Sequence, residues 1–143
     1  MSARFHEQDV KSKLSQKRKL SVFLDELVHQ HRPLIKRTQL TYIFCSDEAL
    51  LEMNRQFLDH DTFTDIITFD LSGKETEMIG EIYVSIDRIA ENAQKFNTDY
   101  QQELHRVIFH GALHLCGFKD KTKKDAAEMR LQEDNCLKAW AIS

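Results

Sequence analysis

Hydrophobic positions along this chain of 143 residues follow two different periods, one typical of strands and one typical of helices. Runs rich in β-branched and aromatic residues predict four strands, near residues 3–6, 39–45, 64–69 and 79–86. Helical spacing and capping residues predict five helices, near residues 15–31, 47–57, 87–96 and 98–116 and from residue 122 onward. This order predicts an α+β fold, a small and mostly four-stranded mixed sheet packed with about five helices.

Composition predicts a single domain that spans residues 1–143. With 41% hydrophobic residues, one proline and four glycines, the chain does not have the composition of a disordered protein. No apolar run approaches the ~20 residues that a membrane span requires, and the polar N-terminus lacks the apolar region of a signal peptide. The three cysteines form no C-x-x-C pattern and each has apolar neighbours. We therefore expect a reduced, cytoplasmic protein with no membrane contact.

The stretch from residue 109 to residue 121, F-H-G-A-L-H-L-C-G-F-K-D-K, holds the clearest candidate chemistry. His110 and His114 are four residues apart in a helical pattern, which places both imidazoles on one helix face. Gly117 suits the end of that helix, because glycine adopts a positive φ without strain. A chain that turns at Gly117 can bring Asp120 toward the two rings. The pattern predicts a metal site with two imidazoles, one carboxylate and an open position for water.

Other interpretations of this stretch stay open. Two histidines at helical spacing are common as surface or core residues, and Cys116 is a further, weaker ligand candidate. Metallopeptidases of the H-E-x-x-H kind carry a glutamate beside the first histidine as general base, and here that position is Gly111. The glycine argues against a peptidase. His105 lies five residues before His110, so it points to another face and is expected to be a structural or surface residue.

Positive charge is clustered although the net charge is −3. One cluster lies in residues 11–19 and is most simply explained as a solvated helix face. The other follows the histidine helix directly and includes Lys119 and Lys121. Cations beside a hydrolytic metal ion would attract a phosphate backbone.

Three blocks of the sequence together resemble one known family. The first fits H-G-x-L-H-L-x-G-[YF]-D-H at His110, Gly111, Leu113, His114, Leu115, Gly117 and Phe118. The second, residues 53–69, reads M-N-R-Q-F-L-D-H-D-T-F-T-D-I-I-T-F and is similar to L-N-x-x-[YF]-R-x-x-D-x-P-T-D-V-L-S-F. The third, G-E-I-Y-V-S at residues 80–85, resembles G-D-I-x-I-S. Their order and separation resemble those of the YbeY family, bacterial metal-dependent endoribonucleases that act in ribosomal RNA maturation.

The resemblance implies a function and a set of partners. It implies a single-strand-specific, metal-dependent endoribonuclease that uses a metal-activated water in 16S 3′-end maturation and ribosome quality control. Ribosomal RNA and the small ribosomal subunit would be its partners. One Zn²⁺ per chain would be held by His110, His114 and Asp120, although this donor set also suits iron, nickel or manganese. Asp65 would orient a ligand histidine, or it would cap a turn.

Two positions depart from the family pattern. Asp120 stands where the family has a third histidine ligand, and a carboxylate leaves the ion less positive, so its bound water is acidified less. Leu58 stands where the family has an arginine that resembles a phosphate contact. Arg55, one helical turn earlier, could replace that arginine, as could Lys119 and Lys121.

Two alternative functions therefore remain beside the endoribonuclease. One is a zincin-like metallopeptidase, which Gly111 opposes. The other is a non-catalytic ribosome-associated factor with a structural metal ion, which would need a fourth protein ligand. Cys116 is the neighbour that could supply it. Three protein ligands and a water molecule would instead favour catalysis.

Overall fold

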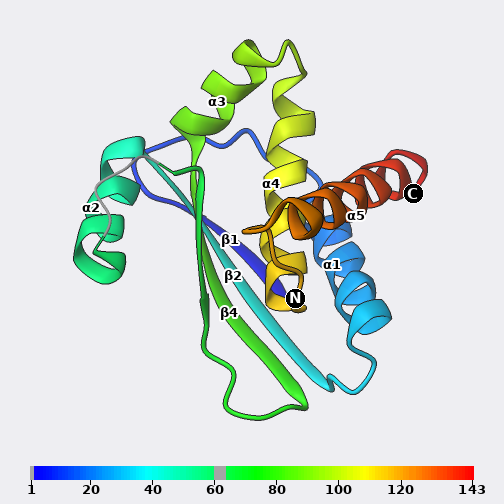
Figure 1. Ribbon diagram of the computed structural model, residues 1–143. Helices are drawn as coiled ribbons and strands as arrows, with labels where there is room; N and C mark the ends of the chain where they lie inside the picture. Colours follow the sequence, from blue (N-terminus) through cyan, green and yellow to red (C-terminus); the bar gives the residue numbers. More distant parts are fainter. Residues whose placement is uncertain (1, 60–63) are drawn as a thin grey trace.

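A computed structural model describes residues 2–59 and 64–143, which form a four-stranded sheet with helices on both faces (Figure 1). The strands are β1 (Ala3–Glu7), β2 (Arg37–Cys45), β3 (Ile66–Asp70) and β4 (Glu77–Ser85). The helices in the described part of the chain are α1 (Lys17–His31), α2 (Asp47–Leu58), α3 (Ile86–Lys95), α4 (Tyr100–Leu115) and α5 (Lys123–Ile142). The predicted α+β class and its mixed four-stranded sheet are confirmed.

The sheet has the strand order β1-β2-β4-β3. Strand β2 runs parallel to both β1 and β4, whereas β3 runs antiparallel to β4. Strand β2 alternates in the way that a two-sided strand requires, because Leu40, Tyr42 and Phe44 enter the main core while Cys45 enters a smaller one. The two central strands are thus buried on both faces where helices cover them.

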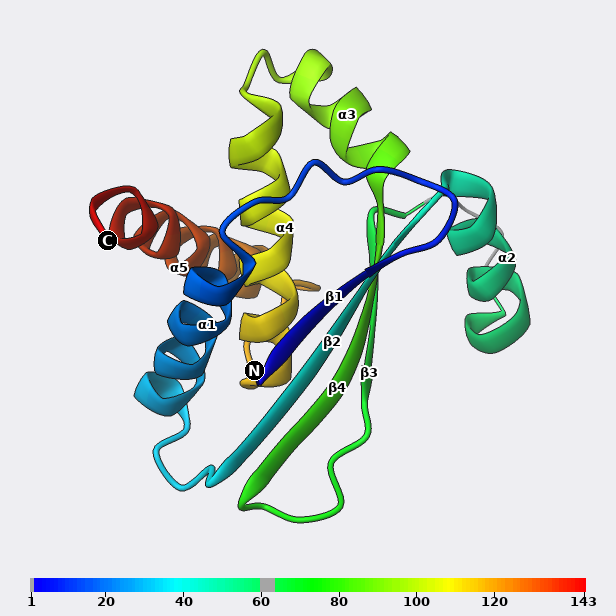
Figure 2. The same cartoon turned by 180° about the vertical axis from the view of Figure 1, so that it is seen from behind.

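Helices α1 and α4 pack on one face of the sheet, α5 packs on α4, and α2 covers part of the opposite face (Figures 1 and 2). The main core lies between the sheet and α1 and α4, and its fully buried side chains include Ile108, Phe109 and Leu113. The smaller cluster lies under α2, around Leu50 and Ile67. No helix in the described residues has the length and apolar surface needed to cross a bilayer.

Local hydrogen bonds explain where the helices begin. The Ser46 hydroxyl accepts the backbone N–H of Ala49 at 3.2 Å and starts α2. The sequence predicts that Thr98 starts α4, but the capping residue is Asp99, whose carboxylate accepts the backbone N–H of Gln102. The Thr98 hydroxyl donates to the Glu103 carboxylate instead. A carboxylate is the stronger cap, and this moves the predicted start by one residue.

Gly111 lies where α4 touches the sheet. A Cβ atom at this position would lie 2.9 Å from Ile82 Cγ2 and 3.1 Å from Ile66 Cδ1. The missing side chain therefore lets α4 approach β3 and β4 closely. This approach brings the histidine face of α4 next to the start of β3, where the candidate site lies.

Candidate metal centre

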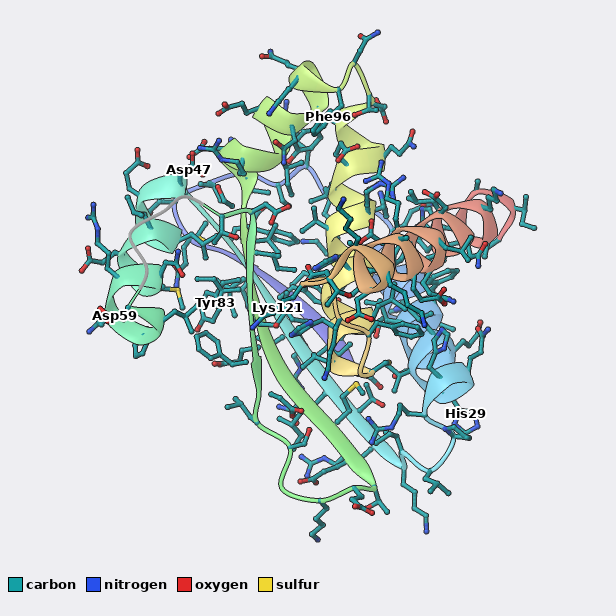
Figure 3. The ribbon with its side chains drawn as sticks, viewed as in Figure 1. His29, Asp47, Asp59, Tyr83, Phe96 and Lys121 are labelled. Carbon is teal, nitrogen blue, oxygen red and sulfur yellow. The ribbon has the colours of Figure 1, made fainter. Side chains whose placement is uncertain are left out.

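A cavity of about 720 Å³ opens between α4, β3 and the C-terminal end of α2. Its lining includes His110, His114 and Asp120, together with Asp65 and Lys121. Lys121 is labelled in Figure 3, where it lies between the sheet and the helices α4 and α5. The structure thus places the three predicted metal ligands on one cavity, with a carboxylate and a lysine beside them.

The imidazole of His110 has a defined partner at each nitrogen. Its Nδ1 lies 2.7 Å from Glu133 Oε2, and its Nε2 lies 3.4 Å from Asp120 Oδ2. In the neutral ring, a proton on Nδ1 donates to the Glu133 carboxylate and leaves the Nε2 lone pair facing Asp120. A metal ion between Nε2 and Asp120 would therefore meet a ligand that is already in the correct tautomer.

Carboxylates dominate the charge around this ring. Burial alone would lower the pKa of His110, but its hydrogen bond to Glu133 and the negative charges of Glu133, Asp65 and Asp120 raise that pKa above the ordinary value. Burial raises the pKa of Asp65, and the charge of His110 opposes this shift in part. The carboxylates of Glu133 and Asp120 contribute to raising both pKa values, so negative charge is concentrated around His110. A bound cation would relieve it.

Two of the predicted donor atoms have a separation that suits a zinc ion. Two ligands on one tetrahedral zinc ion, each about 2.0–2.1 Å from it, lie about 3.4 Å from one another. The separation of His110 Nε2 and Asp120 Oδ2, 3.4 Å, matches this value. Across residues 2–59 and 64–143, no three His, Cys, Asp or Glu side chains are close enough to hold an ion together. The third predicted ligand, His114, is solvent-exposed and lines the same cavity.

The structure places the remaining predicted site residues differently. Arg55 is half-exposed on α2, 4.0 Å from Glu52, and it is not among the described residues that line the cavity. Lys119 is exposed and is also absent from that lining, whereas Lys121 belongs to it. Residues 60–63, in the middle of the second motif, lie outside the described residues.

Two other residues singled out by the sequence lie in the interior. Cys116 is buried in the main core, where burial raises its pKa to about 11. His105 is buried as well, with Nδ1 2.7 Å from the backbone oxygen of Gln101 and its ring stacked on Trp140. Neither residue is among the described residues that line the cavity.

Sequence reasoning missed Glu133, a buried carboxylate on α5. It accepts a hydrogen bond from Arg106 at 3.0 Å in addition to its contact with His110. Its spacing places it on the apolar stripe of α5 with Met129 and Cys136, which both lie in the core. A charged residue at a core position was the available signal, because a buried carboxylate requires a partner.

Comparisons with known proteins show the family of this chain. Residues 4–141 match a family model described as endoribonuclease YbeY. A relative from Cytophaga hutchinsonii with this name is 47% identical over 133 residues, 93% of this chain and 92% of the relative. Another from Parabacteroides distasonis is 39% identical over 142 residues, 99% of this chain and 96% of the relative.

A solved structure shares the fold. The solution structure of TM1509 from Thermotoga maritima is 27% identical, with a TM-score of 0.60 over 97% of this chain and 91% of that one. The family model covers residues 4–141, and the two relatives named above cover 93% and 99% of the chain. The chain therefore belongs to the endoribonuclease YbeY family.

Proposed function

We propose that this protein is a metal-dependent endoribonuclease that cleaves single-stranded RNA during 16S 3′-end maturation and ribosome quality control. Membership of the family supports an endoribonuclease role and thus a hydrolase. One observation carries the metal dependence: His110 Nε2 and Asp120 Oδ2 lie 3.4 Å apart in a cavity that His114 also lines. Ribosomal RNA and the small ribosomal subunit are the proposed partners, and the cytoplasm is the proposed location.

The proposed cofactor is one Zn²⁺ per chain, held by His110, His114 and Asp120. When bound, such an ion acidifies a water molecule or polarises a phosphoryl oxygen. Three protein donors leave one position of a tetrahedral site open for water. The buried thiol of Cys116 belongs to the core and is not among the described residues that line the cavity, so Cys116 does not supply the fourth donor that a structural site would need. This favours catalysis over a structural ion.

The surroundings of the cavity suit a phosphate backbone and unpaired bases. Lys121 lines the cavity and can hold a phosphate next to the ligands, while Arg55 and Lys119 are the proposed outer phosphate contacts. Phe57 is 61% exposed at the end of α2, and its ring packs edge-on against Phe69. An exposed aromatic ring offers an unpaired base a stacking surface. These features support single-stranded RNA as the substrate.

The peptidase alternative lacks its base for a physical reason. Gly111 occupies the position of the glutamate, and a Cβ there would lie 2.9 Å from Ile82. A glutamate at this position would be forced against the sheet instead of reaching the cavity.

The direct test is cleavage of a single-stranded RNA that matches the 3′ end of small-subunit ribosomal RNA. Wild type, His114→Ala and the control His29→Ala would be assayed with and without a chelator. His29 is exposed near the far end of α1 (Figure 3), so its loss leaves the cavity intact. We expect cleavage by wild type and His29→Ala only, and only without the chelator. Equal cleavage by His114→Ala, or cleavage that survives the chelator, would contradict the proposal.

A further inference from the structure

Glu133 connects two helices through both oxygens of its carboxylate. Oε2 lies 2.7 Å from His110 Nδ1, and Oε1 accepts a hydrogen bond from an Arg106 guanidinium N–H at 3.0 Å. The carboxylate is on α5 and its two partners are one helical turn apart on α4. Its side chain is 7% exposed. A single buried carboxylate is therefore fixed from two directions.

Arg106 explains how this carboxylate stays charged inside the protein. A buried carboxylate without a partner is costly, and a guanidinium at hydrogen-bond distance offsets that cost. The other arm of Arg106 binds Asp134 Oδ1 at 2.8 Å, which keeps the guanidinium plane in place. An Arg106–Glu133 pair would be sufficient to tie α5 to α4. The contact of the same carboxylate with His110 is not needed to hold the two helices together, so it calls for a separate explanation.

We propose that Glu133 is a positioning residue for the metal site. Its carboxylate accepts a hydrogen bond from the Nδ1–H of His110 and thereby holds the ring with Nε2 toward Asp120 and the cavity. Carboxylates commonly fix metal-binding histidines in this way, since the hydrogen bond sets both the tautomer and the orientation of the ring. The inference rests on the proposed function, because it requires that His110 binds the metal ion.

Asp134 provides a matched control on the same helix. Asp134→Asn weakens one arm of Arg106 and leaves the carboxylate that faces His110 in place. Glu133→Gln keeps the size of the side chain and removes the negative charge of the group that accepts the hydrogen bond from His110 Nδ1–H. Both variants disturb the α4–α5 contact, whereas only Glu133→Gln disturbs His110.

The test measures zinc affinity by competition with a chromophoric chelator, beside thermal unfolding of each metal-free protein. We expect Glu133→Gln to bind zinc about 10- to 100-fold more weakly. Asp134→Asn should bind zinc like the wild type, and the two variants should lose a similar amount of thermal stability. Equal zinc affinity of Glu133→Gln and wild type would overturn the inference, and so would an equal loss of affinity in the control. A wild type that binds no zinc would instead refute the proposed cofactor.

A second measurement needs no variant to fold. Nitrogen-15 spectra of the histidine rings in metal-free wild type, taken at alkaline pH where the rings are neutral, report which nitrogen carries the proton. We expect His110 to carry it on Nδ1. A proton on Nε2 would overturn the inference whether or not zinc binds.

Discussion

Replacing Gly111 with alanine tests the close approach of α4 to the sheet. In a helix that faces solvent, the change from glycine to alanine stabilises a protein by about 1 kcal/mol. Here the new Cβ would lie 2.9 Å from Ile82 Cγ2 and 3.1 Å from Ile66 Cδ1. Ordinary contacts between carbon atoms are about 3.5–4.0 Å, so α4 or its neighbours must move.

The two effects on stability oppose each other. Overpacking of a core usually costs about 1–3 kcal/mol, and the helix propensity of alanine offsets about 1 kcal/mol of it. Ile82 is fully buried, and its Cγ2 branches directly from Cβ, so it cannot swing away as the end of a long chain could. We therefore expect a net change in the free energy of unfolding between zero and a loss of about 2 kcal/mol.

Urea denaturation of metal-free wild type and Gly111→Ala measures this change, and Ile82→Ala completes a double-mutant cycle. Removing the Ile82 methyl groups makes room for the new Cβ. The double variant should therefore lose less stability than the sum of the single variants. A gain of about 1 kcal/mol for Gly111→Ala alone, as in a solvent-facing helix, would refute the steric reasoning. Strict additivity in the cycle would refute Ile82 as the obstructing residue.

Three further changes test other parts of the molecule. Tyr42→Phe removes a buried hydrogen bond of 2.7 Å to the Ile108 carbonyl on α4, so urea denaturation should show a loss of about 1 kcal/mol; an unchanged stability would contradict this. Lys121→Gln should weaken RNA binding and lower its salt dependence, whereas Lys138→Gln on the exposed side of α5 should leave both unchanged. Burial lowers the pKa of His105 below 6.5, so the unfolded chain takes up its proton first on acidification. The stability that the neutral ring provides is complete above pH 6.5 and is lost as the pH falls through the lowered pKa. Thermal unfolding across this range should show a flatter acid limb for His105→Gln, and an identical limb would count against the assignment.

The elements of the fold could be predicted because their signals are local. Period, β-branching and caps act over a few residues, so every predicted strand and helix exists in the structure. The error at Thr98 was also local, since the neighbouring Asp99 is the better cap. The gathering of His110, His114 and Asp120 around one cavity follows from helix spacing and the positive φ of 111° at Gly117.

Long-range contacts could not be predicted in the same way. Glu133 is 23 residues from His110 in the chain, and only the packing of α5 on α4 joins them. The resemblance offered Asp65 either as the residue that orients a ligand histidine or as a turn cap, and it gave no sign that Glu133 contacts His110 Nδ1. Asp65 itself lines the cavity. Arg55 was proposed because it lies one helical turn before Leu58. The sequence did not show which face of α2 is turned toward the cavity, and Leu58 lines the cavity whereas Arg55 is not among its described lining residues.

His110 is held in place by more contacts than the other two predicted ligands, His114 and Asp120. The turn of α4 from Ile108 to Gly111 is fixed by the Tyr42 hydroxyl from β2, by the contact of Gly111 with β4, and by Glu133 from α5. One turn later His114 is exposed, and Asp120 lies beyond the end of α4 with 45% of its side chain exposed. Exposed side chains change rotamer at little cost, whereas His110 would have to break a partly buried hydrogen bond to Glu133. In the proposed zinc site, His110 would therefore be the fixed ligand, and His114 would be the ligand that moves to complete the set. Among the described residues no three donors are close enough to hold an ion, so the proposed site requires this movement of His114.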